Sequence, residues 1–115
     1  MKHYKSLKEL LTDWEQLPSL GTIYAKSLNE SEIENQGYWV YSNEEQEKEE
    51  TIETKNGDLI PKSLQNHKAR SVFETATLKA IIKNKLKHNP KLTISSTNEF
   101  IDAINYYLDN DDFLD

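Results

Sequence analysis

Three segments of this sequence carry apolar side chains at helical spacing, and the need to bury all three stripes limits the fold more than any other feature. Ser6 and Glu9 have the spacing of a capping box at the start of the first segment, and Pro18 marks its end. The apolar face of this segment consists of Leu7, Leu10, Leu11, Trp14 and Leu17. Three such helices need a common apolar surface, which one face of a β-sheet supplies.

The other two stripes lie toward the C-terminus. We predict a helix over residues 76–88, capped by Thr75 and ended by Pro90. Its buried face consists of Leu78, Ile81, Ile82 and Leu86. A last helix is predicted to begin at Ser96, and its face consists of Phe100, Ile101, Ile104, Tyr107 and Leu108. Residues 109–115 should form a turn after it, because carboxylates there oppose the helix dipole.

Short runs rich in β-branched and aromatic residues lie between these helical segments. Residues 22–28, 38–42 and 71–74 are predicted strands. Asn56-Gly57 is a turn signal that predicts a small hairpin within residues 51–60. We therefore predict a single α+β domain over residues 1–115, in which a small, mostly antiparallel sheet of three or four strands packs with about three helices.

Composition excludes several classes of protein. The chain has no cysteine, which rules out disulfides and thiolate metal sites and makes the cytoplasm the expected compartment. No apolar run approaches the roughly 18 residues of a membrane span, and polar residues from Lys2 onward do not fit a secretory signal. A chain of 115 residues can bury one modest core.

Residues that carry catalysis or bind metals form no recognisable pattern here. His3, His67 and His88 lack metal-ligand spacing, and the glycines are too far apart for a phosphate-binding loop. Asp109 and Asp111 have the spacing of two calcium-loop ligands, but the glycine and the glutamate of that loop are missing. We therefore predict that the protein is not an enzyme, holds no metal and needs no cofactor.

Charge divides the chain into acidic, basic and acidic parts. Residues 1–61 contain 13 acidic and 6 basic side chains, residues 62–91 contain 1 acidic and 8 basic, and residues 92–115 contain 6 acidic and no basic side chain. These charges either cancel across the folded surface or present an acidic face to a basic partner. An acidic face would raise association rates more than affinity.

The run EEQEKEE at residues 44–50 is the strongest acidic feature, and its lack of apolar residues predicts a mobile loop or a solvated edge. We predict that this run is the main contact surface for a partner, with acidic residues near the C-terminus second. Outward-facing tyrosines, either Tyr38 and Tyr41 or Tyr106, would add aromatic contact area. The predicted contact set is Glu44, Glu45, Glu47, Glu49, Glu50, Asp109, Asp111, Asp112, Tyr38 and Tyr41.

The basic segment 62–91 supports a different hypothesis, in which the protein is a nucleic-acid-linked regulator or antitoxin. Lys79, Lys83 and Lys87 recur at every fourth residue on one side of the predicted helix, and such charge suits phosphate contacts. The acidic balance of the whole chain and the lack of aromatic residues among these lysines favour a helix face that offsets acidic neighbours instead.

Four stretches of the sequence together resemble a known family: LLTDWEQLP, GTIYAKSL, TLKAIIKNKL and the closing NEFIDAINYYLDNDDFLD. The last stretch contains Ala103, Tyr106 and Tyr107, followed by Asp112-Phe113-Leu114. It is similar to the A-x-x-Y-Y…D-[AD]-F-[IL] ending of small acidic bacterial immunity proteins from polymorphic toxin systems, which include contact-dependent growth inhibition. Residues 43–69 depart from that pattern by being more polar.

The resemblance implies a protein that binds and neutralises the C-terminal domain of a cognate toxin, with a nuclease as the expected toxin. It transfers no individual functional residue, because immunity proteins differ most where they contact their toxins. An acidic inhibitor would suit a nuclease, since it can cover the basic groove that holds the substrate phosphates. The leading hypothesis is therefore an immunity protein that blocks a substrate-binding or active-site surface.

Overall fold

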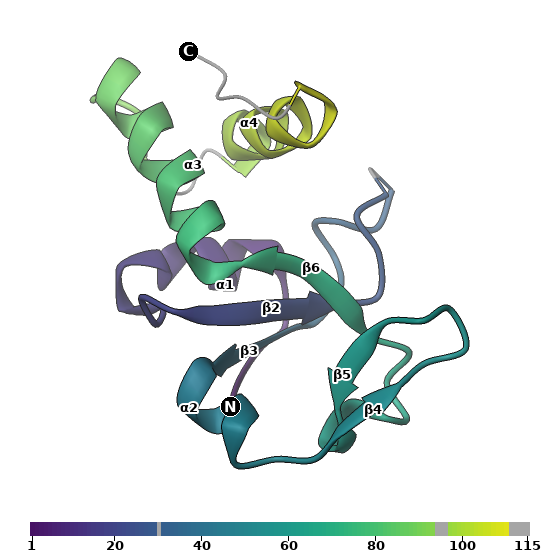
Figure 1. The fold of residues 1–115 in the computed structure, drawn as a ribbon. Helices are drawn as coiled ribbons and strands as arrows, with labels where there is room; N and C mark the ends of the chain where they lie inside the picture. Colours follow the sequence, from purple (N-terminus) through teal and green to yellow (C-terminus); the bar gives the residue numbers. More distant parts are fainter. Residues whose placement is uncertain (30, 94–96, 111–115) are drawn as a thin grey trace.

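A four-stranded antiparallel sheet forms the centre of the molecule, with its strands in the order β1-β3-β2-β6 (Figure 1). The computed structural model describes residues 1–29, 31–93 and 97–110. The strands are β1 (Lys2–Tyr4), β2 (Gly21–Ala25), β3 (Tyr38–Ser42) and β6 (Arg70–Glu74). A second, two-stranded antiparallel sheet consists of β4 (Thr51–Glu53) and β5 (Leu59–Pro61). The turn between β4 and β5 contains Gly57 at a positive φ of 85°, as the Asn-Gly signal predicts.

Three of the helices cover one side of the central sheet, and the small sheet lies on the other side together with the short helix that follows β3 (Figure 1). The helices are α1 (Leu7–Thr12), α2 (Asn43–Glu47), α3 (Thr75–His88) and α4 (Thr97–Asn110), with 3-10 turns η1 (Trp14–Gln16) and η2 (Lys62–Leu64). The predicted α+β class with a small antiparallel sheet is confirmed. No helix of the described residues is long and apolar enough to cross a membrane.

The larger core lies between the sheet and the helices. Ile23 from β2 and Val40 from β3 are buried in it together with the apolar faces of α1, α3 and α4. The helical residues of this core are Leu7, Leu10, Leu11, Leu78, Ile81, Ile82, Phe100, Ala103 and Ile104. The three predicted stripes therefore share one sheet face, as expected from their need for a common apolar surface.

A smaller core lies on the opposite face of the sheet. Tyr24, Trp39 and Tyr41 alternate with the residues of the larger core along β2 and β3. They pack against Ile60 of β5, Leu64 of η2 and Ala69. The small sheet thus covers the second face of the central sheet. The molecule therefore has three layers: helices, central sheet and small sheet.

This second core corrects the prediction that Tyr38 and Tyr41 face outward. Both side chains are only 1% exposed. Tyr38 lies in the larger core and donates a hydrogen bond to the Ile33 carbonyl at 2.5 Å, while Tyr41 lies in the smaller core and hydrogen-bonds to Ser63. The two tyrosines lie on opposite faces of β3, and the sequence did not reveal that both faces are covered. Tyr106, in contrast, is 38% exposed.

Helix α1 begins where the capping signal predicts and ends earlier than its apolar stripe suggests. The Ser6 hydroxyl accepts a hydrogen bond from the Glu9 amide, and the Glu9 carboxylate accepts one from the Lys5 amide. The α-helix stops after Thr12, and the chain continues as η1. The half-buried Trp14 packs against the larger core from that turn.

The start of α3 differs from the prediction that Thr75 caps it. Glu74 occupies the cap position without a side-chain cap bond, and Thr75 already belongs to the helix. The Thr75 hydroxyl is buried and donates to the Gly21 carbonyl of β2 at 3.4 Å. Because β6 runs directly into α3, this threonine ties the first turn to the sheet rather than to its own helix.

Helix α4 includes two residues that were predicted differently. Asp109 lies within the helix rather than in a turn, and the Asn110 side chain donates to the Tyr106 carbonyl at 3.0 Å, which supplies a partner to the last turn. Leu108 is 43% exposed, so it does not belong to the core face, which centres on Phe100, Ala103 and Ile104. The predicted cap Ser96 lies outside the described residues.

Candidate functional site

The acidic run at residues 44–50 begins with a short helix and is not simply the loop that its composition predicts. Ser42 and Glu45 form a complete capping box: the Ser42 hydroxyl accepts from the Glu45 amide at 3.2 Å, and the Glu45 carboxylate accepts from the Ser42 amide at 3.0 Å. None of the residues of α2 is buried. Local hydrogen bonding therefore orders this segment, and the signal S-x-x-E at residues 42–45 was present in the sequence.

Three of the five predicted contact glutamates in this run have partners within the protein. Glu45 also forms an ion pair with the amino group of Met1. Glu49 accepts a hydrogen bond from the Ser63 amide at 2.6 Å, and Glu50 lies 3.4 Å from Lys62 Nζ. These carboxylates fasten the segment to the N-terminus and to η2. Glu44 and Glu47 are exposed, and neither has a hydrogen bond or an ion pair within the described part of the chain.

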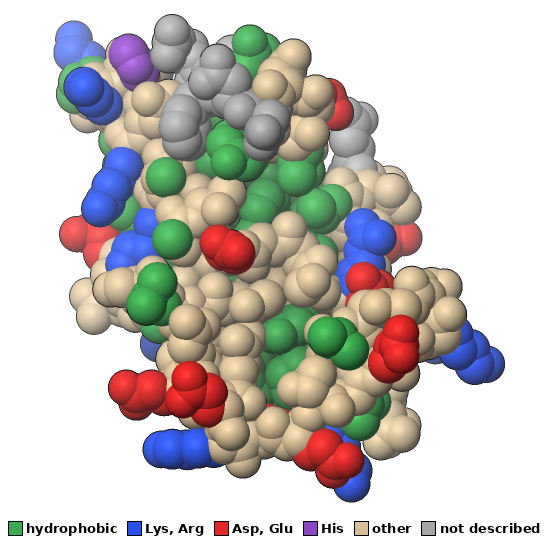
Figure 2. All heavy atoms as spheres, in the orientation of Figure 1, with side chains coloured by type: hydrophobic (Ala, Val, Ile, Leu, Met, Phe, Trp, Pro, Cys, Tyr) green, Lys and Arg blue, Asp and Glu red, His purple; other side chains and the backbone are tan. Residues whose placement is uncertain are grey.

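The described part of the C-terminal acidic surface lies away from α2. Asp109 is exposed near the end of α4, and Figure 1 shows α4 and α2 at opposite ends of the molecule. Asp111 and Asp112 lie outside the described residues. In Figure 2, acidic side chains are scattered over the visible face, and basic ones gather at its upper left, over α3. Among the described residues, the predicted carboxylates are therefore concentrated at the α2 surface.

The lysines of α3 are divided between structural contacts and solvent. Lys79 donates to the Leu17 carbonyl at 2.9 Å, and the largely buried Lys85 lies 3.5 Å from the Glu99 carboxylate of α4. Lys83 and Lys87 are exposed. Lys79, the first of the three lysines that the sequence suggests for phosphate contacts, is therefore engaged in a contact within the protein.

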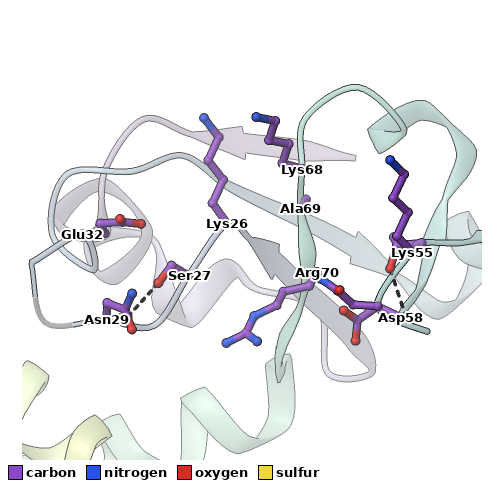
Figure 3. Close-up of a pocket in the computed structure, with 11 residues that line it drawn as sticks. Lys26, Ser27, Asn29, Glu32, Lys55, Asp58, Lys68, Ala69 and Arg70 are labelled. Carbon is purple, nitrogen blue, oxygen red and sulfur yellow. Dashed lines mark hydrogen bonds between the residues drawn. The ribbon is translucent and has the colours of Figure 1, made fainter.

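A different set of cations lines a cavity of about 550 Å³ at one end of the sheet (Figure 3). Its cations are Lys26, Lys55, Lys68 and Arg70, and its acidic lining residues are Glu32 and Asp58. In Figure 3 the three lysine side chains extend toward the same side, whereas Arg70 extends toward Asn29. We call this cavity the basic pocket.

The sheet register explains why these four cations line the same cavity. Ala25, the last residue of β2, lies opposite Arg70, the first residue of β6. Lys26 and Lys68 therefore lie just outside the paired ends of β2 and β6, at the same end of the sheet. Lys55 arrives from the β4–β5 turn, because β5 and β6 lie in contact. Sequence reasoning noted Lys68 and Arg70 within the basic segment but missed Lys26 and Lys55, since only the folded chain brings them together.

Lys68 has a positive φ of 55°, which a side chain other than glycine seldom adopts. This residue immediately precedes Ala69, which is buried in the smaller core, and Arg70, which is exposed. The left-handed backbone therefore reverses the chain at the pocket wall. Such conformations cost free energy and are found preferentially at binding sites.

Sequence comparison places the protein in a family. Residues 4–115 match a family described as a domain of unknown function, DUF7716. The chain belongs to the DUF7716 family. Comparisons with curated proteins and with solved structures gave no match.

A second cavity of the DUF7716 domain, of about 670 Å³, adjoins the basic pocket and shares Lys26 and Lys68 with it. Its wall contains three neighbouring rings, of which His3 and Trp39 are stacked and His67 is tilted by 48° relative to Trp39. Trp39 stacks on His3 with ring centroids 4.9 Å apart and an interplanar angle of 27°, and the His67 ring lies 5.0 Å from Trp39. The indole is 8% exposed, whereas both imidazoles are exposed. We call this cavity the ring pocket.

Among the described residues, no group of three or more metal-binding side chains lies close enough to hold an ion. The strongest pKa shifts belong to tyrosines in the cores. Burial raises the pKa of Tyr38 to about 12 and raises those of Tyr24 and Tyr41. These phenols act as hydrogen-bonding supports at neutral pH.

Proposed function

We propose that this protein is a noncatalytic immunity protein, which binds and neutralises a bacterial toxin domain, with a nuclease as the expected target. The observation that carries the proposal is the fixed α2 helix with Glu44 and Glu47 directed to solvent. Both carboxylates have no partner in the described structure, although the rest of the acidic run is fastened down. Carboxylates that are already held on an ordered helix lose little backbone conformational entropy when a basic partner binds them.

Apolar side chains beside α2 would supply the packed centre that tight inhibition needs. Leu20 is 67% exposed, and its carbonyl accepts a hydrogen bond from the amide of Asn43, the first residue of α2. Met1 is 55% exposed and pairs with Glu45 through its amino group. An apolar centre rimmed by charges is the arrangement in which a few residues dominate binding. The proposed contact surface is therefore α2 with Leu20 and Met1.

Electrostatics favours a basic target for this surface. The chain has a formal net charge of −6, and its exposed α2 carboxylates would steer a positively charged groove toward it. Rim charges contribute little affinity by themselves, so they should act mainly on the association rate. A nuclease groove, which must hold phosphates, carries such a charge.

Co-purification with a neighbouring toxin tests this proposal. The protein is expressed with the C-terminal domain encoded by the preceding gene, and only that domain carries a tag. Equal amounts eluting together at high salt, with loss of the toxin activity, is the expected result. A toxin domain that fails to bind even at low salt would sink the proposal for that pair.

Two variants test the assigned surface. Glu44→Lys with Glu47→Lys should slow association at low salt by roughly tenfold or more and weaken its salt dependence. Leu20→Asp should accelerate dissociation, because it places a charge at the apolar centre. The matched control is Asp102→Lys with Asp109→Lys, which reverses two exposed charges on α4, far from α2 in Figure 1. If the control slows association as much as the α2 pair, the surface assignment is wrong.

A further inference from the structure

We propose that the basic pocket binds the phosphate group of a nucleotide, either free or within a single strand, and that the adjoining ring pocket takes its base. Met1 lines the ring pocket and also belongs to the α2 surface, but none of the variants below changes Met1, so the two proposals can fail independently. This site involves residues from separate stretches of the chain, which include β1, the end of β2, β3, the β4–β5 turn and the approach to β6. The argument rests on charge, geometry and ring chemistry.

Charge is the first support. An acidic protein has ample carboxylates to neutralise its cations, yet Lys26, Lys55, Lys68 and Arg70 gather around one cavity. The ion pairs of the described residues involve Lys2, Lys62, Lys85 and the amino terminus, so none of the four pocket cations is paired. Glu32 and Asp58 line the same cavity, so its described side chains carry an excess of two positive charges. A bound anion would offset that excess.

The identity of these cations points to phosphate. Arg70 is the single arginine of the chain, and a guanidinium donates two parallel hydrogen bonds to phosphate oxygens in a way that lysine does not. Arg70 extends across the pocket toward Asn29, while the lysine amines extend to the other side (Figure 3). The lysine side chains are exposed and turn about several bonds, so they can swing toward a phosphate that the guanidinium holds.

The acidic residues that line the cavity indicate a ligand that carries hydrogen-bond donors in addition to its phosphate. Glu32 and Asp58 lie in the same cavity as the cations. Their carboxylates repel a simple anion, but they accept hydrogen bonds from sugar hydroxyls or base amino groups. A nucleotide supplies both a phosphate for the cations and such donors for the carboxylates. Inorganic phosphate supplies only the first.

The ring pocket provides a place for the base. It shares Lys26 and Lys68 with the basic pocket, so one ligand can reach from one to the other. His3 and His67 flank Trp39 and leave their outer faces to solvent. Bases stack on aromatic side chains irrespective of sequence. Gly37 supports this arrangement, because a β-carbon there would lie 2.7 Å from His3 Nε2 and displace that ring.

Binding assays with three probes test the proposal on the full chain. The probes are ADP, a fluorescein-labelled oligouridine of about ten nucleotides, and inorganic phosphate, each measured at low salt. Binding of ADP identifies a free nucleotide as the ligand, and binding of the oligouridine alone identifies a single strand. Equal binding of inorganic phosphate and ADP would exclude the base-binding half. No binding of any probe would overturn the whole proposal.

Charge-matched variants locate the site. Lys68→Gln with Arg70→Gln should weaken binding of the effective probe at least tenfold. Lys83→Gln with Lys87→Gln removes the same charge from the exposed side of α3 and should change binding less than twofold. Equal losses in both pairs would show attraction by overall charge and would overturn the site. Gly37→Ala should weaken a nucleotide but not inorganic phosphate.

One further variant separates binding from folding. Lys68→Gly removes a pocket cation and also relieves the positive φ of residue 68. The melting temperature should therefore stay equal or rise, while binding weakens at least threefold. A weaker affinity in a protein of unreduced stability cannot come from unfolding. Unchanged affinity in this variant and in Arg70→Gln would contradict the assignment of the cavity.

Discussion

The Tyr4 hydroxyl donates a hydrogen bond to the Asp13 carboxylate at 2.6 Å, and Lys2 Nζ lies at the same distance from the same oxygen. This contact joins β1 to the end of α1, since Asp13 is the residue after the last turn of that helix. The hydrogen bonds from Lys2 and then Tyr4 hold the pKa of Asp13 below its ordinary value. Burial, followed by the hydrogen bond to Asp13, raises the pKa of Tyr4.

The first prediction concerns stability in acid. Because the folded-state pKa of Asp13 lies below its unfolded value, its contribution is present above the unfolded pKa, about 4, and is lost as the pH falls through the folded value. Asp13→Asn should lower the free energy of unfolding at pH 7 by about 1 kcal/mol. Urea unfolding at several pH values measures this, and the difference from the wild type should shrink in acid. A difference independent of pH would contradict the ionic role of Asp13.

Strand β1 shows where sequence reasoning on the fold stopped. The three helical stripes, the strands at 38–42 and 71–74 and the hairpin followed from local patterns, because periodicity and turn residues act over a few positions. Residues 2–4 carry no such pattern, since only Tyr4 is buried there. They form a strand because β3 offers an open edge, with Lys2 opposite Val40. Pairing at a sheet edge is a tertiary effect, and the sequence of a three-residue segment does not indicate it.

The candidate sites show the same division. The signal that orders α2 was present in the sequence as Ser42 and Glu45, but the high charge of the run argued for a loop. The basic pocket could not be predicted, because Lys26, Lys55 and Arg70 come from three distant stretches. Their meeting depends on the register of β2 with β6 and on the position of the small sheet.

A second prediction concerns Tyr38, which anchors one wall of the basic pocket. Its hydroxyl donates to the Ile33 carbonyl and accepts from Gln36 Nε2 at 3.2 Å, and Gln36 also accepts from the Ser27 amide. Tyr38→Phe removes the donor to the Ile33 carbonyl and one acceptor of Gln36, which keeps its hydrogen bonds with Ser27, and should cost about 1 to 2 kcal/mol in urea unfolding. Tyr106→Phe removes the same oxygen from an exposed ring and should be nearly neutral. Equal effects would contradict the anchoring role.

Alkaline pH tests the same residue independently. Burial raises the pKa of Tyr38 to about 12, so the folded state favours the neutral phenol. The resulting stabilisation is complete below the unfolded tyrosine pKa of about 10 and is lost as the pH rises through the folded value. The wild type should therefore lose stability between these two values, and Tyr38→Phe should lose less. Parallel losses in the two proteins would rule out Tyr38 as the titrating group.

A third prediction concerns Gly21, the first residue of β2. A β-carbon there would lie 2.3 Å from the Tyr41 carbonyl oxygen and 3.1 Å from the Ser42 Cα on the neighbouring strand. Both atoms are backbone, so the strand pair itself must move, and Gly21→Ala should cost about 2 to 3 kcal/mol. A β-carbon at Gly57 would make an ordinary contact, 3.9 Å from a Glu53 carboxylate oxygen, so Gly57→Ala is strained only by its positive φ and should cost about 1 kcal/mol. Thermal unfolding that reverses this order would contradict the close approach.

The last prediction separates the structural from the solvent-directed carboxylates of the acidic run. Glu45 and Glu49 accept hydrogen bonds from the Ser42 and Ser63 amides, whereas Glu44 and Glu47 do not take part in such contacts within the described chain. Glu45→Gln with Glu49→Gln should therefore lower the free energy of unfolding by about 1 to 2 kcal/mol. Glu44→Gln with Glu47→Gln, which removes the same charge, should change it by less than about 0.5 kcal/mol.

Partner binding should follow the opposite order. Loss of the two exposed carboxylates should slow association with a basic toxin domain, while loss of the two fastened ones should act only through stability. Association rates measured at a temperature where both variants are fully folded separate these effects. If only the Glu45 and Glu49 pair lowers the association rate, the partner depends on the position of the α2 backbone rather than on the exposed carboxylates of α2. Such a result would move the contact surface toward Met1 and η2, where these two carboxylates are held.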